Sequence, residues 1–464
     1  MPSVLPLVPT LPVSRLWREA RRLRPALLPL ALASALLVSS DSARATCSDN
    51  LGTLPAAATP AGDATAPRMS LLQMIEAANR QSKAVGAARL LAEAARNDEA
   101  ETAAAALPQA NLVGTASTNG SQDMDGRPQR TPMQLRPSVT VTLPLWDAGR
   151  QSALNQWRRS LSQAALQGQI STQEQVALQT VALAFDRSRY RLHTQVWSQY
   201  AQKMCTLVDS LEQIAAADKG RRSELVQARK SLQSVLLSRA QALSQLNLTE
   251  ARLRKLVGDR LPEATGLTSL LLEVPDLARL KQQAADSPTV MQVAAQAEAA
   301  GSMAEATIAG QKPQVGWLAQ LAKSVSRNDH SGNWNAGVQL TMPLFSPGSA
   351  PAAAAARQRA EAARLQRLEV LEQLQSRLDE VNEQAQSSIT RARDVMGALR
   401  NSEQVRDDTV AMWQQLGRRT LFDVMSAEGD HFNLRLAYVD ALHDGQQAVA
   451  LMWSLAASVT VPLR

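Results

Sequence analysis

The feature that most restricts the fold of this 464-residue chain is an internal repeat. Four short motifs of the first half recur in the same order in the second half. These are Leu107-Pro108-Gln109 with Lys312-Pro313-Gln314, Leu143-Pro144-Leu145-Trp146 with Met342-Pro343-Leu344-Phe345, Gly149 with Gly348, and Gly220-Arg221-Arg222-Ser223 with Gly417-Arg418-Arg419-Thr420. Their offsets are 205, 199, 199 and 197 residues. Four landmarks in one order at nearly one offset indicate a duplicated unit.

Each unit combines a helical stretch, a strand hairpin and a much longer helical stretch. The first helix covers 71–106 in one unit and 290–310 in the other, and proline ends it because proline has no N–H to donate. The long helices cover 149–217 and 349–416. The first of these has no proline, and at about 1.5 Å per residue it would extend roughly 100 Å. Helices of this length, with apolar residues three and four apart, are typical of coiled coils.

The strands are predicted from an apolar–polar alternation with a period of two. Val139, Val141 and Leu143 alternate with Ser138, Thr140 and Thr142, similar patterns occur at 315–321 and 338–342, and a weaker one occurs at 109–117. Apolar-out, polar-in alternation over about ten residues is what a membrane β-barrel requires. An ordinary antiparallel sheet with one wet face has the same pattern, so alternation alone leaves both structures open.

The N-terminus is typical of an exported protein. An arginine-rich region precedes an apolar run from Ala26 to Val38, and Ala43-Arg44-Ala45 supplies a small-x-small cleavage pattern. We therefore expect residues 1–45 to be a signal peptide, and their removal lowers the net charge from +7 to +3, because they carry six arginines and two acidic residues. Lipidation of Cys47 stays open, and Cys205 is expected to be a small packing residue rather than part of a disulfide framework.

The residue types exclude several classes of function. A mature charge near neutral, without basic blocks among aromatics, gives no reason to expect nucleic-acid binding. No phosphate-binding glycine loop or nucleophile elbow occurs, so no enzyme, cofactor or metal site is predicted. The four histidines do not cluster with other metal ligands, and His431 and His443 are expected at the surface.

The strand count predicts an assembly of several copies. After residue 45 no apolar segment approaches 18 residues, so a membrane protein of this kind would cross the bilayer as β-strands. Four strands cannot close a barrel, two copies give a barrel filled by side chains, and three copies give twelve strands. We predict a flexible mature N-terminus at 46–69, a first repeat at 70–260, a connector with short helices at 261–288 and a second repeat at 289–464.

These motifs resemble those of the outer-membrane efflux protein (TolC) family over nearly all of the mature chain. The strand exit at 142–150, its echo at 341–348 and the turn at 417–427 carry the resemblance. It implies a mainly α fold with a small β part: long coiled-coil helices form a periplasmic tunnel, and four strands per chain join a trimeric twelve-stranded membrane β-barrel. Such a protein lies in the bacterial outer membrane and extends into the periplasm.

The resemblance also assigns a periplasmic aperture. Asp423 would form a ring of three carboxylates there, although an ordinary helix-start charge is the alternative. Ser426 stands where a second carboxylate is typical of the family, which puts a double acidic ring in doubt. Arg419 matches a residue that ties neighbouring coils together. In the first repeat the matching turn, 220–228, is two residues shorter in this alignment, and Glu224 is the candidate partner.

Trp146 and Phe345 follow proline at the strand ends and are predicted to be anchors at the membrane–water interface, or else to pack on the tops of the helices. Members similar to this chain serve type I secretion, and the resemblance extends to a component that exports an adenylate cyclase–haemolysin toxin. It implies a passive duct for a secreted protein, partnered by a periplasmic adaptor and an inner-membrane ABC transporter. A multidrug or metal efflux duct is the alternative, and a periplasmic coiled-coil scaffold is a third.

Overall fold

The computed structural model describes residues 65–118, 120–122, 128–130, 133–262, 266–326, 330–416 and 419–464. All of them belong to one compact unit, Thr46–Arg464. The expected signal peptide and residues 46–64 of the segment predicted to be flexible lie outside the described residues. The rest of that segment, 65–69, was predicted wrongly, because it is helical.

The helices repeat with equal lengths in the two halves of the chain. There are three matched pairs: α2 (Lys83–Ala104) and α6 (Pro288–Ala309) with 22 residues each, α3 (Arg150–Ala217) and α7 (Ser349–Leu416) with 68 each, and α4 (Arg222–Val257) and α8 (Leu421–Ala456) with 36 each. The boundaries of α3 and α7, and those of α4 and α8, are offset by 199 residues. The predicted long helices at 149–217 and 349–416 are therefore confirmed almost to the residue.

The first predicted helix differs from the structure. The stretch 71–106 is divided into α1 (Thr65–Gln81) and α2, because Ser82 takes an extended conformation and caps α2. Its hydroxyl oxygen accepts a hydrogen bond from the Val85 N–H at 3.3 Å. The connector contains the predicted short helices, a 3₁₀ turn η3 (Leu267–Ser269) and α5 (Leu277–Ala284), and the chain closes with a turn η4 (Val461–Leu463).

Four long strands form one antiparallel sheet in the order β1-β4-β5-β6. They are β1 (Gln109–Ser117), β4 (Gln134–Trp146), β5 (Gln314–Val325) and β6 (His330–Thr341). The connection between β1 and β4 contains two further short strands, β2 (Gly120–Gln122) and β3 (Pro128–Arg130), which pair with each other. Residues 119, 123–127, 131–132 and 327–329, in the connections between these strands, lie outside the described residues.

The sheet continues directly into the helices. Between β4 and α3 the chain turns at Gly149, whose φ of 87° is a left-handed conformation that glycine adopts without strain. The Asp147 carboxylate accepts a hydrogen bond from the Gly149 N–H at 3.1 Å and so satisfies a free donor at the start of α3. This turn lies between Trp146, the last residue of β4, and Arg150, the first residue of α3.

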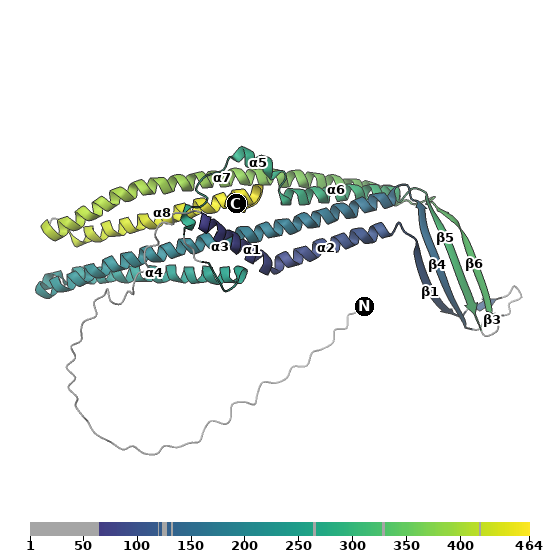
Figure 1. Ribbon diagram of the computed structural model, residues 1–464, viewed down its shortest axis with the longest axis horizontal. Coiled ribbons are helices and arrows are strands. Elements are labelled where there is room, and N and C mark those ends of the chain that lie inside the picture. The colour runs from purple at the N-terminus through teal and green to yellow at the C-terminus, as the bar shows by residue number, and fades with distance from the viewer. Residues whose placement is uncertain are drawn as a thin grey trace, which may run out of the picture. The chain divides into compact units, whose positions relative to one another are not determined.

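The helices pack side by side, with α3 in contact with α2, α4, α6 and α8, and α7 in contact with α6 and α8. The turns between α3 and α4 and between α7 and α8 lie at the end of the helices opposite the sheet (Figure 1). Apolar clusters between the helices form the core, with Phe185 and Leu211 of α3 fully buried. None of the described helices has both the length and the apolar character needed to cross a membrane.

Candidate functional site

The strand registers bring nearly all apolar residues to one face of the four-stranded sheet. Leu112 pairs with Val139, and Val139 pairs with Leu321, which in turn pairs with Trp334. Side chains directly opposite each other lie on the same face. The apolar face therefore contains Leu112, Leu135, Val139, Val141, Leu143, Val315, Trp317, Leu321, Val325, Trp334, Val338 and Leu340, with alanine, glycine and proline between them. Two polar side chains, Lys323 and His330, lie on the same face where β5 ends and β6 begins.

The opposite face is polar in every strand. Asn111 pairs with Thr140, which pairs with Gln320, which pairs with Asn335, and the neighbouring positions continue with serine, threonine and glutamine. Val113 and Leu318 are the large apolar residues on this side. The alternation predicted for single strands thus becomes two continuous surfaces of opposite character.

The apolar face is uncovered within the chain. Leu112 is 76% exposed and Trp334 is 78% exposed, although both side chains are largely apolar. An apolar surface that spans four strands and faces solvent marks a contact with lipid or with another protein.

The sheet has two open edges among the described residues. β1 pairs only with β4, and β6 pairs only with β5, so one side of each strand presents unpaired backbone N–H and C=O groups. Such edges readily accept another strand, including one from a second copy of the chain.

The two aromatic residues predicted as interface anchors lie at the sheet–helix junction. Trp146 ends β4 and pairs with Val315, which places it on the apolar side, and it is 53% exposed. Phe345 follows the end of β6 by four residues and is 89% exposed. Phe345 is thus almost fully exposed within the chain and Trp146 is half-exposed, and their role as anchors stays a prediction.

At the opposite end of the helices, Asp423 forms a capping box with Thr420. The Asp423 carboxylate accepts hydrogen bonds from the Thr420 N–H at 2.9 Å and from its hydroxyl at 3.0 Å, and the Asp423 N–H donates to that hydroxyl at 3.3 Å. The backbone hydrogen bond from Thr420, followed by its side-chain bond and the charge of Arg419, lowers the pKa of Asp423. Asp423 therefore stays ionised, and its helix-start role is directly visible.

The other aperture candidates lie around this turn. Arg419 and Ser426 are exposed, and a pocket of about 240 Å³ lies between the starts of α4 and α8. Glu224, Thr420 and Phe422 line it. The expectation that the first turn is two residues shorter is wrong: four residues separate α3 from α4 and four separate α7 from α8. The glycine simply occupies a different place in each turn, and Glu224 and Asp423 are both the third residue of their helix.

Sequence reasoning missed an ionic cluster between α3 and α8. Arg189 contacts Asp440 at 2.6 Å and Asp444 at 3.0 Å, and His193 lies 2.8 Å from the same oxygen of Asp440. Burial alone would raise the pKa of Asp440, but the hydrogen bond and charge of His193 and the charge of Arg189 lower it below its ordinary value. No sequence signal marks this cluster, because its members lie about 250 residues apart in the chain.

Three expectations about single residues are corrected. His431 and His443 are buried rather than at the surface, with exposed fractions of 6% and 0%. Cys205 packs in the core as expected, but it is also disulfide-bonded. Cys47, the second cysteine of the sequence, lies outside the described residues. Within the described part of the chain no group of three or more histidine, cysteine or acidic residues is arranged to hold a metal ion.

No protein-family model matches the chain, and no curated protein matches it in sequence. Solved structures are similar over most of its length. CusC superposes with a TM-score of 0.75 at 17% identity, covering 88% of this chain and 98% of its own. The outer membrane protein VceC of Vibrio cholerae gives 0.72 at 18% identity, covering 84% and 97%. The CmeC outer membrane channel of Campylobacter jejuni gives 0.71 at 13% identity, covering 93% of each chain. The chain therefore has the fold of these channels: long helices with a small four-stranded antiparallel sheet.

Proposed function

We propose that the chain is one third of a trimeric channel that crosses the bacterial outer membrane and continues into the periplasm as a helical tunnel. The observation that carries this proposal is the sheet, with an apolar exposed face, a polar opposite face and two open edges. Lipid would cover the apolar face and water would fill the side of the polar face, as in membrane β-barrels. The likeness to outer-membrane channel structures supports the same arrangement.

The open edges support an assembly of several copies. An unpaired strand edge in lipid costs several kcal/mol for each unsatisfied backbone group, so β1 must pair with β6 of another copy. A barrel of two copies, with about eight strands, has an interior largely filled by side chains. Three copies contribute twelve strands and leave room for a bore.

The helices present matching edges. Leu90 and Leu91 of α2 are 60% and 68% exposed, and Leu365 and Leu368 of α7 are 58% and 60% exposed. These two helices continue from the two edge strands of the sheet, α2 into β1 and β6 into α7. Closing the ring of strands would therefore bring α2 of one copy against α7 of the next and bury these leucines.

The α7–α8 turn supplies the narrow periplasmic end in this proposal. Three copies of Asp423 would form an acidic ring, with Arg419 linking neighbouring coils, whereas Ser426 would contribute no second ring of charge. The ionised state and fixed geometry of Asp423 support this role. Replacement of Asp423 with alanine should change the single-channel conductance, and an unchanged value would exclude it from the constriction.

The finer proposal is a type I secretion duct. The chain carries no nucleotide-binding motif, so the energy would come from an inner-membrane ABC transporter joined through a periplasmic adaptor, and the cargo would be a secreted protein toxin. Expression in two strains tests this, one lacking the outer-membrane channel of a toxin secretion system and one lacking that of a drug pump. Restored toxin secretion would support the proposal, and restored drug resistance alone would assign the chain to efflux.

Conductance of the purified mature protein in planar bilayers, measured together with its oligomeric mass, tests the channel itself. Discrete conductance steps from a trimer are expected. A soluble protein that produces no conductance would contradict the proposal and favour a periplasmic coiled-coil scaffold, because a scaffold explains the helices without a membrane.

A further inference from the structure

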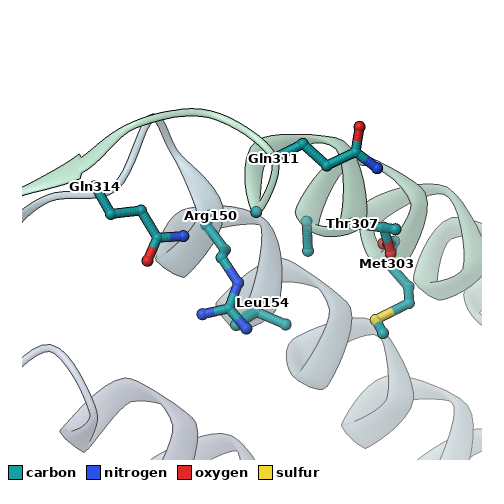
Figure 2. Close-up of a pocket in the computed structure, with 8 residues that line it drawn as sticks. Arg150, Leu154, Met303, Thr307, Gln311 and Gln314 are labelled. Carbon is teal, nitrogen blue, oxygen red and sulfur yellow. The ribbon is translucent and has the colours of Figure 1, made fainter. Parts of the chain in front are cut away.

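A pocket of about 440 Å³ lies where β5 and the start of α3 meet the end of α6. Figure 2 shows the side chains of Arg150 and Gln314 extending to the same side of this junction, whereas the Gln311 amide points away. Gln311 donates to the Ser349 carbonyl at 2.7 Å. The Arg150 guanidinium has no hydrogen-bond or ion-pair partner among the described residues, and its lining neighbours Leu154 and Met303 are apolar.

A second pocket, of about 310 Å³, continues along the helices from the first. The two pockets share Met303 and Thr307 as lining residues. The second pocket adds Trp157, Leu161 and Arg359, whose guanidinium likewise has no ion-pair partner in the described part of the chain. Neither pocket is lined by a carboxylate. The two together form a groove with two free cations and an aromatic and aliphatic wall.

This groove faces the same side as the polar face of the sheet. Gln314 begins β5 and alternates with Val315, so it belongs to the polar face together with Gln320. On the helices, α6 turns Gln296, Ala299 and Met303 to the groove. Its opposite side, with Ala297, Glu298 and Gly301, lines a different pocket together with Arg364, Arg367 and Leu368 of α7.

The position of α5 agrees with this assignment. Lys281 of α5 contacts Asp379 of α7 at 2.7 Å, and Leu280 packs in the same cluster as Leu378. Arg364 lies two heptads before Leu378, so the Arg364 pocket is on the side that α5 covers. A helix layered on the inner side would fill the bore. The groove with Arg150 and Arg359 is therefore on the inner side of the tunnel, an assignment that rests on the proposed channel.

We infer that this groove is a luminal binding site for amphipathic organic anions, molecules with a sulfonate, phosphate or carboxylate group on an apolar body. The guanidinium groups would donate charge-assisted hydrogen bonds to the anionic group, and Trp157, Leu161 and Met303 would cover the apolar body. A trimer holds three grooves and six such arginines, just below the barrel. The acidic ring proposed at Asp423 lies at the other end, so the bore would change the sign of its charge along its length.

Open-channel block in planar bilayers tests this inference. Octanesulfonate should reduce the current of the wild-type channel, and inorganic sulfate should reduce it far more weakly. Any block by octyltrimethylammonium should be no weaker in the Arg150/Arg359 variant than in the wild type. In the double variant Arg150→Gln/Arg359→Gln the concentration for half-block should rise at least about tenfold, as expected for loss of charge-assisted hydrogen bonds. The matched control Arg364→Gln/Arg367→Gln removes equal charge from the opposite side of α7 and should leave the block unchanged.

Equal block in the wild type and the Arg150/Arg359 variant would overturn the inference, as would equal block by sulfate and octanesulfonate. These outcomes differ from the failure of the proposed function, which would appear as an absence of channels. In that case, calorimetric titration of octanesulfonate into protein held in amphipol decides the question. Binding that is lost in Arg150→Gln/Arg359→Gln supports the site, and binding that is equal in both proteins, or absent from both, overturns it.

Discussion

The two repeats share one backbone plan but differ in which helices are buried. Phe185 of α3 is fully buried, whereas Gln384, its counterpart 199 residues later in α7, is exposed. The second helices differ in the opposite sense. Leu237 of α4 is 72% exposed, and its counterpart Leu436 of α8 is 9% exposed. The duplication therefore accounts for the equal lengths of the helices, and the side chains make α3 and α8 the more buried helices of the chain and α4 and α7 the more exposed ones.

The turns of the two repeats differ as well. Each turn has four residues, but α8 begins with the Thr420–Asp423 capping box, whereas α4 begins at Arg221 without a side-chain cap. The box fixes the direction in which the Asp423 carboxylate points, and nothing comparable fixes Glu224. If the chain closes a bore at this end, the second repeat supplies the rigid part of the closure.

The largest effect is expected from a charge placed on the apolar face of the sheet. Val338→Arg places a charge on the apolar face of β6, and Gln339→Arg places the same charge on the polar face of the same strand. A lipid-facing arginine costs about 2–4 kcal/mol near the bilayer midplane, and a trimer carries three. Val338→Arg should therefore abolish sedimentation with outer membranes. If Gln339→Arg has an equal effect, the assignment of the faces is wrong.

The ionic cluster between the interior helices should give the next largest effect. Arg189→Met leaves Asp440 and Asp444 without their cation and should lower the free energy of unfolding by about 2–3 kcal/mol, somewhat less than for a fully buried pair. Arg377→Met, which removes an exposed pair on the edge helix α7, should cost less than about 1 kcal/mol. Thermal unfolding of both variants checks this.

This effect should depend on pH. The pKa of Asp440 is lowered in the folded protein, so its contribution is present above the ordinary value of 3.8 and is lost as pH falls through the folded pKa. The difference between Arg189→Met and the wild type should therefore shrink in acid. A difference that grows in acid would contradict the ionic account.

Glu428 of α8 should affect stability with the opposite dependence on pH. Burial raises its pKa, the charges of Arg406 and Lys203 lower it only in part, and its Oε2 atom has no hydrogen-bond partner among the described residues. The folded protein then loses stability as pH rises above the ordinary value of 4.5. Glu428→Gln should stabilise the protein by about 1 kcal/mol at pH 7 and change little at pH 4. Exposed Glu369→Gln is the control, and destabilisation by Glu428→Gln at neutral pH would refute the prediction.

The smallest effect is expected from substitutions at the starts of α4 and α8, which compare the two turns directly. Thr420→Ala removes the capping box and should cost about 1 kcal/mol, whereas Arg221→Ala at the matching position removes no cap and should be nearly neutral. Amide hydrogen exchange in the first turns of α4 and α8 reports both changes. Each rate is compared with that of the wild type at the same turn, and an equal acceleration in α4 and α8 would show that the turns do not differ as described.

The sequence predicted the fold well where the signal is local. The alternation around Val139 predicted a strand, and the glycine at 149 together with the absence of proline up to 217 predicted the long helix. Prediction from the sequence failed where the burial or the partner of a residue depends on another helix. His443 is buried because α8 is an interior helix, and Arg189 meets Asp440 only after the helices pack. The Ser82 break was missed because one serine within an alanine-rich stretch resembles an ordinary helical position.

The central claim is that β1 of one copy pairs with β6 of the next, and cysteine cross-linking tests it most directly. Within one chain β4 and β5 separate these strands by three spacings, about 14 Å, which is beyond the reach of a disulfide. Thr115→Cys on β1, combined in turn with Asn333→Cys or Asn335→Cys on β6, should give a covalent trimer on a denaturing gel after oxidation, one that reduction removes. Each cysteine alone, and the wild type, should stay at the mass of one chain. Dimers as the end product, or no cross-link in any pair, would contradict the trimeric channel.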